Sequence, residues 1–174
     1  MKFIPQYPAI VLENPKFPRN ASAIIRLASC FGIKQVWYTG QRMEDFLTGM
    51  KRLPREERMK GYQDVEFIGC DYPFNYMVDC EPVAVELLPG ATPLTYFTHP
   101  ENAVYIFGPE DGTISKGLRS LSHHFVIIPS RHCLNLATAV SAVLTHRVTQ
   151  TGWMPERMIE YRVPEDFASD VELG

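Results

Sequence analysis

Three polar turns contain the residues whose types and order suggest chemistry. The first turn contains Asn20, with Arg26 further along the helix that follows it. The second turn is Gly108-Pro109-Glu110, and the third has Cys133-Leu134-Asn135 soon after Pro129. Each turn follows a short apolar run that predicts a buried strand, and open α/β sheets bind their ligands at the carboxyl ends of strands. Carboxylate, amide and guanidinium groups from the three turns are therefore candidates for a ligand-binding site.

Short apolar runs predict the strands that must position these turns. They contain little of the apolar–polar alternation of a sheet with one solvated face, so we expect parallel strands covered on both faces by helices. A helix is predicted over Asn20 to Phe31, with Asn20 as its N-terminal cap and Gly32 at its end. A second helix is predicted to start at Asn135. The predicted strands are Ala9 to Leu12, Gln35 to Tyr38, Val83 to Leu87, Ala103 to Phe107 and Phe125 to Ile128.

The composition predicts one soluble domain spanning residues 1–174. The chain is 45% apolar and contains no low-complexity tract, which fits a single full-sized core. Its N-terminal region lacks the apolar run of a signal peptide, and no stretch approaches the length of a membrane span. Four cysteines without a CxxC pair indicate neither a zinc site nor a disulfide framework. We therefore expect a cytoplasmic protein that makes no membrane contact.

The charge balance excludes proteins that hold nucleic acid by bulk positive charge. The chain has 17 Lys and Arg against 20 Asp and Glu, a net charge of −3, so any such contact must come from a local patch. One candidate is Gln41 to Tyr62, where basic residues are interleaved with Glu56 and Glu57. We interpret this segment as a solvated helix or loop, or alternatively as a patch that contacts phosphates.

Several common cofactor motifs are missing. The segment GPEDGTISKG lacks the residue order of a phosphate-binding P-loop, and no G-x-G-x-x-G occurs, so ATP and nicotinamide cofactors are disfavoured. His123-His124 and His132 have no third ligand at a useful spacing, and we expect no metal site.

Three stretches together resemble a known family. They are IVLENPKFPRNASAIIRLASCFGI, IFGPEDG and VIIPSRHCLNLATAVSAVL, which are similar to the three motifs of the SpoU/TrmH branch of the SPOUT RNA methyltransferases, in the same order. The resemblance covers nearly the whole chain and is to the minimal, single-domain members. It implies an α/β domain with a mostly parallel sheet, helices on both faces and a C-terminal trefoil knot. It also implies a homodimer that binds S-adenosylmethionine in the knotted loops.

The resemblance implies catalytic roles for four residues. Arg26 matches an arginine that acts at a ribose 2′-hydroxyl, where a guanidinium can orient and polarise but hardly deprotonate. Asn20 would organise the site, Glu110 would hold Arg26 or the knot loops, and Asn135 would bind the substrate hydroxyl or the methionine part of the donor. Each residue also has a structural alternative: a surface arginine, a turn glutamate and two helix caps.

The resemblance implies a cofactor pocket as well. Gly108 would let the backbone approach the cofactor closely. The chain has Cys133 where the family commonly has serine, a better hydrogen-bond donor, and its loop from Pro129 to Cys133 is shorter. The predicted cofactor-binding residues are Glu86, Leu87, Gly108, Ile128, Cys133 and Leu134.

These observations predict a methyltransferase that modifies a ribose 2′-hydroxyl of RNA, with tRNA favoured and rRNA an alternative. Specificity for the target would lie in Gln41 to Cys80 and in RNA shape. Two other functions stay open: an RNA-binding protein of the same fold without turnover, and a methyltransferase acting on a small molecule or protein.

Overall fold

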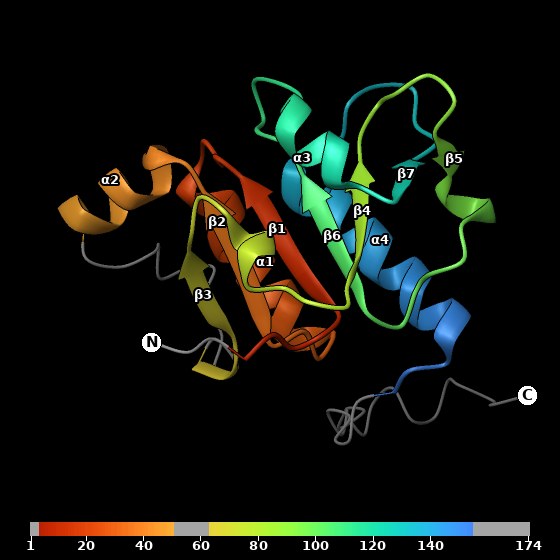
Figure 1. The fold of residues 1–174 in the computed structure, drawn as a ribbon, viewed down its shortest axis with the longest axis horizontal. Helices are drawn as coiled ribbons and strands as arrows, with labels where there is room; N and C mark the ends of the chain where they lie inside the picture. The colour runs from red at the N-terminus through yellow and green to blue at the C-terminus, as the bar shows by residue number, and fades with distance from the viewer. Residues whose placement is uncertain (1–3, 51–62, 155–174) are drawn as a thin grey trace, which may run out of the picture.

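The computed structural model describes residues 4–50 and 63–154. Within them, seven strands form one sheet in the order β3-β2-β1-β6-β4-β7-β5, and every pairing is parallel (Figure 1). Strand order reverses beside β1, because β2 and β3 extend the sheet on one side and the later strands on the other. The strands are β1 (Ala9–Glu13), β2 (Gln35–Thr39), β3 (Glu66–Gly69), β4 (Glu81–Val85), β5 (Thr92–Pro93), β6 (Ala103–Phe107) and β7 (His124–Ile127).

Helices cover both faces of this sheet, as expected for strands that are apolar on both sides. Alternate residues of β6 enter two separate cores: Tyr105 packs in the cluster that includes α1 and α4, and Ile106 packs in the cluster that includes α3. The predicted fold class is therefore confirmed, while the C-terminal knot stays a prediction. The helices are α1 (Pro18–Cys30), α2 (Gln41–Met50), α3 (Lys116–Leu121) and α4 (Leu136–Thr151), with short 3-10 turns η2 (Pro73–Asn75) and η3 (Leu94–Tyr96).

The start of α1 differs from the prediction. Phe17 is the N-cap residue and Pro18 is the first helical residue, so Asn20 lies inside the first turn and the prediction that it caps the helix was wrong. Proline favours the first position because its fixed φ suits the helix and its missing N–H would have no helical partner. The predicted end is confirmed, since α1 stops at Cys30 and Gly32 takes the left-handed conformation with φ +71°.

Strand predictions hold to within two residues. The strand predicted at Val83 to Leu87 is instead Glu81–Val85, so Glu86 and Leu87 follow it, and the last predicted strand begins one residue earlier than expected. Strands β3 and β5 and helix α3 were not predicted. Helix α2 occupies the first part of the charged segment Gln41 to Tyr62, and residues 51–62 lie outside the described part of the chain. None of the described helices has the length and apolarity needed to cross a bilayer.

A polar network lies between β6 and the end of α4. His99 Nδ1 is 2.6 Å from the Tyr105 hydroxyl, and its Nε2 is 2.8 Å from His146 Nδ1. Arg147 donates to the Tyr105 hydroxyl at 3.1 Å and to the Pro100 carbonyl at 2.6 Å, which satisfies a guanidinium on the buried face of the helix. Burial, with His146 and Arg147 close by, lowers the pKa of His99 to about 4.

Candidate active site

One pocket collects nearly all the predicted site residues. It has a volume of about 410 Å³ and lies at the carboxyl ends of β4, β6 and β7, next to the first turn of α1. This is the edge where ligands bind in open α/β sheets, close to the point where strand order reverses. Nine of the ten predicted residues line it: Asn20, Glu86, Leu87, Gly108, Glu110, Ile128, Cys133, Leu134 and Asn135.

A chain of hydrogen bonds joins three of these residues across the mouth of the pocket. The Asn135 side-chain oxygen accepts from the backbone N–H groups of Ala137 and Thr138 at 2.9 and 3.4 Å, so Asn135 caps α4 as predicted. Its amide nitrogen donates to the Asn20 side-chain oxygen at 3.0 Å, and the Asn20 amide nitrogen donates to Glu110 Oε1 at 2.7 Å. Because the first acceptor is fixed by the helix, both amides have one possible orientation.

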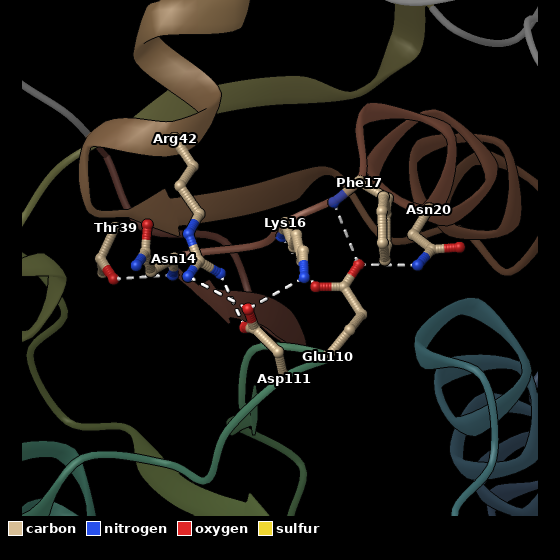
Figure 2. Close-up of polar contacts among 8 residues, drawn as sticks. All are labelled: Asn14, Lys16, Phe17, Asn20, Thr39, Arg42, Glu110 and Asp111. Carbon is tan, nitrogen blue, oxygen red and sulfur yellow. Dashed lines mark hydrogen bonds and ion pairs between the residues drawn. The ribbon is translucent and has the colours of Figure 1, made fainter.

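Glu110 is the last residue in this series of hydrogen bonds, and its carboxylate caps α1. Its carboxylate accepts from the backbone N–H of Lys16 at 2.7 Å and of Phe17 at 3.3 Å (Figure 2). Helix α1 has no side-chain cap from its own N-cap residue, so Glu110 supplies a negative charge and an acceptor at the positive end of the helix. The glutamate is therefore bound to the first turn of α1, and the predicted contact with Arg26 is not formed.

The neighbouring Asp111 forms a second link that the sequence did not indicate. Its carboxylate lies 3.2 Å from Lys16 Nζ and receives two hydrogen bonds from Arg42, at 2.8 and 3.3 Å (Figure 2). The hydrogen bonds from Arg42 and then Lys16 lower the pKa of Asp111 to about 2. The β6–α3 loop is thus attached both to the β1–α1 loop and to the start of α2.

Arg26 is the one predicted residue that does not line the pocket. It is exposed on α1, six residues beyond Asn20. Along an α-helix, a side chain six residues later lies about 9 Å further along the axis and roughly 120° around it from the first side chain. Arg26 therefore lies on a different face of α1 from Asn20 and outside the lining of the pocket.

One wall of the pocket is held by hydrogen bonds from backbone N–H groups to the Glu86 side chain and by the close approach of two backbone segments at Gly108. Glu86 Oε1 accepts from the Leu87 N–H at 2.9 Å, and its Oε2 accepts from the Ile114 N–H at 3.0 Å. A Cβ atom on Gly108 would lie 2.9 Å from the Ile114 nitrogen, so the chain's own loop requires glycine at this position. Further lining residues were not predicted from the sequence, and three of them directly adjoin predicted ones: Val85, Phe107 and Leu136. The others are Phe17, Gly112, Ser130 and Ala139.

The third turn leads into the pocket from β7. The Ser130 hydroxyl lies 3.3 Å from the Ile128 carbonyl oxygen and 2.9 Å from that of His132, which folds this short loop on itself. Cys133 and Leu134 follow as exposed side chains at the pocket. Within residues 4–50 and 63–154, no group of three or more His, Cys, Asp and Glu side chains is arranged to hold a metal ion.

Comparison with known proteins gives the family. The model of the SpoU rRNA Methylase family matches residues 8–145. No curated protein matches the chain significantly.

Three solved structures illustrate the fold. The TrmH/SpoU tRNA modifying enzyme of A. aeolicus aligns with TM-score 0.71 and 18% identity, over 84% of this chain and 77% of that one. The SpoU methyltransferase AviRb from Streptomyces viridochromogenes, in complex with AdoMet, aligns with TM-score 0.63 and 19% identity over 82% and 60% of the two chains. A structure concerned with 2-OH methylation of C/U34 on tRNA aligns with TM-score 0.64 and 19% identity over 83% and 95%. With the family model covering most of its length, this chain belongs to the SpoU methylase family of RNA methyltransferases.

Proposed function

We propose that this protein transfers the methyl group of S-adenosylmethionine to a ribose 2′-hydroxyl of RNA, and that tRNA is its substrate. The observation that carries the proposal is the hydrogen-bonded chain Asn135–Asn20–Glu110 at the mouth of the pocket. It links three separate motif positions at the ligand-binding edge of the sheet. Its two amides have fixed orientations, as preorganised catalytic groups require.

The pocket fits the methyl donor of the family. SpoU methyltransferases use S-adenosylmethionine, which supplies an electrophilic methyl group. The volume of about 410 Å³ lies within the range of small-molecule sites. Ile128 and Leu134 would contact the adenine, and Leu87 would contribute a further apolar wall. Glu86, which is oriented by two backbone N–H groups, would accept hydrogen bonds from the polar part of the donor.

Asn20 and Asn135 would orient the reacting groups. Each amide nitrogen has two hydrogens and uses one in the chain of hydrogen bonds described above, so each keeps one donor for a ligand. A ribose oxygen or the donor's carboxylate could accept these hydrogen bonds. Alignment of the hydroxyl with the methyl group, together with exclusion of water, would account for the protein's share of the rate.

We further propose that the active form is a homodimer in which Arg26 acts in the partner's site. The support is its placement: Arg26 is exposed, lies on a different face of α1 from Asn20 and does not line the pocket of its own chain. A mixed dimer of an Arg26→Ala chain with an Asn135→Asp chain tests this idea. If Arg26 acts across the interface, the mixed dimer has one intact site and recovers up to half of the wild-type activity per dimer. If Arg26 acts within its own chain, both sites of every mixed dimer carry a lesion and activity stays at the level of the single variants.

The preference for tRNA draws on two of the similar structures, which concern tRNA modification and 2-OH methylation on tRNA. The net charge of −3 favours recognition through a few local contacts rather than a broad basic surface. Transfer of labelled methyl to purified tRNA and, separately, to rRNA distinguishes the two substrate classes.

Asn135→Asp provides a sharp test of the proposed reaction. Aspartate keeps the acceptor that caps α4 but cannot donate to Asn20, so we expect an intact fold and a loss of methyl transfer of about 100-fold or more. Unfolding and S-adenosylmethionine binding are measured beside the transfer rate. If Asn135→Asp transferred methyl to RNA as fast as the wild type, the assignment of Asn135 would be refuted. If the wild type bound the donor but transferred methyl to no RNA, the result would favour an RNA-binding protein without turnover.

A further inference from the structure

A second pocket lies on the neighbouring part of the same sheet edge. It has a volume of about 370 Å³ and is lined by the ends of β1 and β2, by segment 71–75 and by α3. The first pocket occupies the ends of β4, β6 and β7. Since adjacent strands are about 4.8 Å apart, the two pockets are separated by a few strand spacings, or about 10–20 Å. One RNA strand can therefore reach both of them.

The wall of this second pocket combines an exposed aromatic ring with apolar contacts. Tyr72 is 73% exposed and Leu121 is 50% exposed, although both belong to a concave site. Phe74 and Leu118 form the inner side, where they pack in the core cluster beneath α3. A planar, partly apolar ligand that stacks on Tyr72 would cover this surface.

Two carboxylates give the second pocket its polar character. Glu13 Oε2 accepts from the Ser115 N–H at 2.7 Å, and Asp71 Oδ1 accepts from the Gly40 N–H at 3.0 Å. Within the described residues, the other oxygen of each carboxylate has no hydrogen-bond donor. These oxygens can accept from N–H groups at the edge of a ring.

Basic side chains stand beside the second pocket, where a backbone phosphate would pass. Strands β1 and β2 lead from its lining residues Glu13 and Thr39 directly to Lys16 and Arg42. Both side chains converge on Asp111 (Figure 2). They remain about two-fifths exposed, at 43% for Lys16 and 41% for Arg42. The carboxylates of Asp111 and the adjacent Glu110 balance these two positive charges, so a phosphate oxygen would be bound by the remaining N–H donors of Lys16 and Arg42 rather than by a local excess of charge.

We propose that the second pocket binds a base of the substrate RNA close to the methylated nucleotide. The base stacks on Tyr72, its amino group donates to Asp71 or Glu13, and its phosphate contacts Lys16 and Arg42. Stacking on aromatic rings with hydrogen bonding at the base edge is the usual way in which proteins read unpaired RNA. Because both carboxylates accept hydrogen bonds, bases with an exocyclic amino group bind better than uracil. This inference rests on the proposed function, since it takes RNA as the ligand.

Binding of labelled tRNA, measured by fluorescence anisotropy without the methyl donor, tests the second pocket. Tyr72→Ala should weaken binding about 5- to 150-fold, the range for loss of one stacked base, and should raise KM for tRNA more than it lowers kcat. Tyr72→Phe, which keeps the ring, should bind within about twofold of wild type. The matched control is Tyr96→Ala, because Tyr96 is 82% exposed and belongs to neither pocket.

The outcomes separate this inference from the proposed function. Weaker binding by Tyr72→Ala alone supports the second pocket even if no methyl is transferred, in which case the proposed reaction fails by itself. Equal effects of Tyr72→Ala and Tyr96→Ala, or no effect of either, overturn the second pocket while methylation by the wild type can still stand. A wild type that binds no RNA overturns both.

Base preference provides an independent check. Single-stranded oligonucleotides of one base should bind more tightly when they consist of adenine, cytosine or guanine than of uracil. Asp71→Asn keeps an acceptor for Gly40 and replaces the second oxygen with a donor, so it should reduce that preference. Equal affinity of the wild type for all four oligonucleotides overturns the assignment of the carboxylates.

Discussion

Replacement of Glu110 by alanine removes three hydrogen bonds at the start of α1. The carboxylate accepts from Lys16 N at 2.7 Å, Phe17 N at 3.3 Å and Asn20 Nδ2 at 2.7 Å. Loss of a helix cap costs about 0.5–2 kcal/mol, and loss of the bond to Asn20 adds about 1 kcal/mol. We therefore expect the free energy of unfolding to fall by about 2 kcal/mol, which for a chain of this size lowers Tm by about 4–8 °C.

Denaturant unfolding of wild type and variants at one protein concentration measures this change. Glu101→Ala is the matched control, because Glu101 is exposed and its side chain has no hydrogen bond within the described residues. Glu110→Gln keeps one acceptor oxygen and should lose about half as much stability. If Glu110→Ala were no less stable than Glu101→Ala, the capping role of Glu110 would be refuted, and with it the physical basis of the link between the second motif and α1.

Three further predictions follow from other parts of the molecule. Burial holds the pKa of His99 at about 4, below its usual 6.5, so the folded state binds fewer protons than the unfolded state between these pH values. The free energy of unfolding should therefore fall as pH drops from 6.5 to 4, by up to about 1.4 kcal/mol per pH unit. His99→Gln should flatten this slope when unfolding is measured against pH. Gly32→Ala should destabilise the protein by about 1–2 kcal/mol, because φ at Gly32 is +71° and the added Cβ would collide with Trp153. Gly49→Ala should stabilise it by up to about 1 kcal/mol in the same denaturation assay, because Gly49 lies in α2 and nothing occupies the space its Cβ would fill. Cys133→Ser should leave stability unchanged and raise methyl transfer about 2- to 10-fold if a hydroxyl at this place donates to a ligand; lower transfer would show that the thiol suits the site better.

Local sequence signals predicted most of the fold. Strand β6 matched its prediction at Ala103–Phe107 because five apolar residues are followed by a Gly-Pro turn. Strand β5 was missed because two residues, Thr92 and Pro93, give no pattern and pair only with the neighbouring β7. Helix α3 was missed because six residues, with Gly117 among them, are too few for helical periodicity.

Nine of the ten predicted site residues line one pocket and Arg26 does not, while the contacts among these residues could not be read from local patterns. Asn20 and Glu110 are 90 residues apart in the sequence. The high propensity of asparagine for N-cap positions predicted that Asn20 caps α1, but Phe17 is the N-cap residue and Glu110 supplies the side-chain acceptor. The link from Asp111 to Arg42 spans 69 residues and was not anticipated at all. Such contacts depend on which loops the sheet brings together, and strand order is a tertiary property.

The most direct test of the central claim is the position of the transferred methyl group. RNA labelled from S-adenosylmethionine is digested to nucleosides, and mass spectrometry determines whether the label lies on the ribose or on the base. We predict a single class of 2′-O-methylated nucleoside that disappears with Asn135→Asp. A label on the base, or no label in any RNA from a protein that binds the donor, would contradict the account.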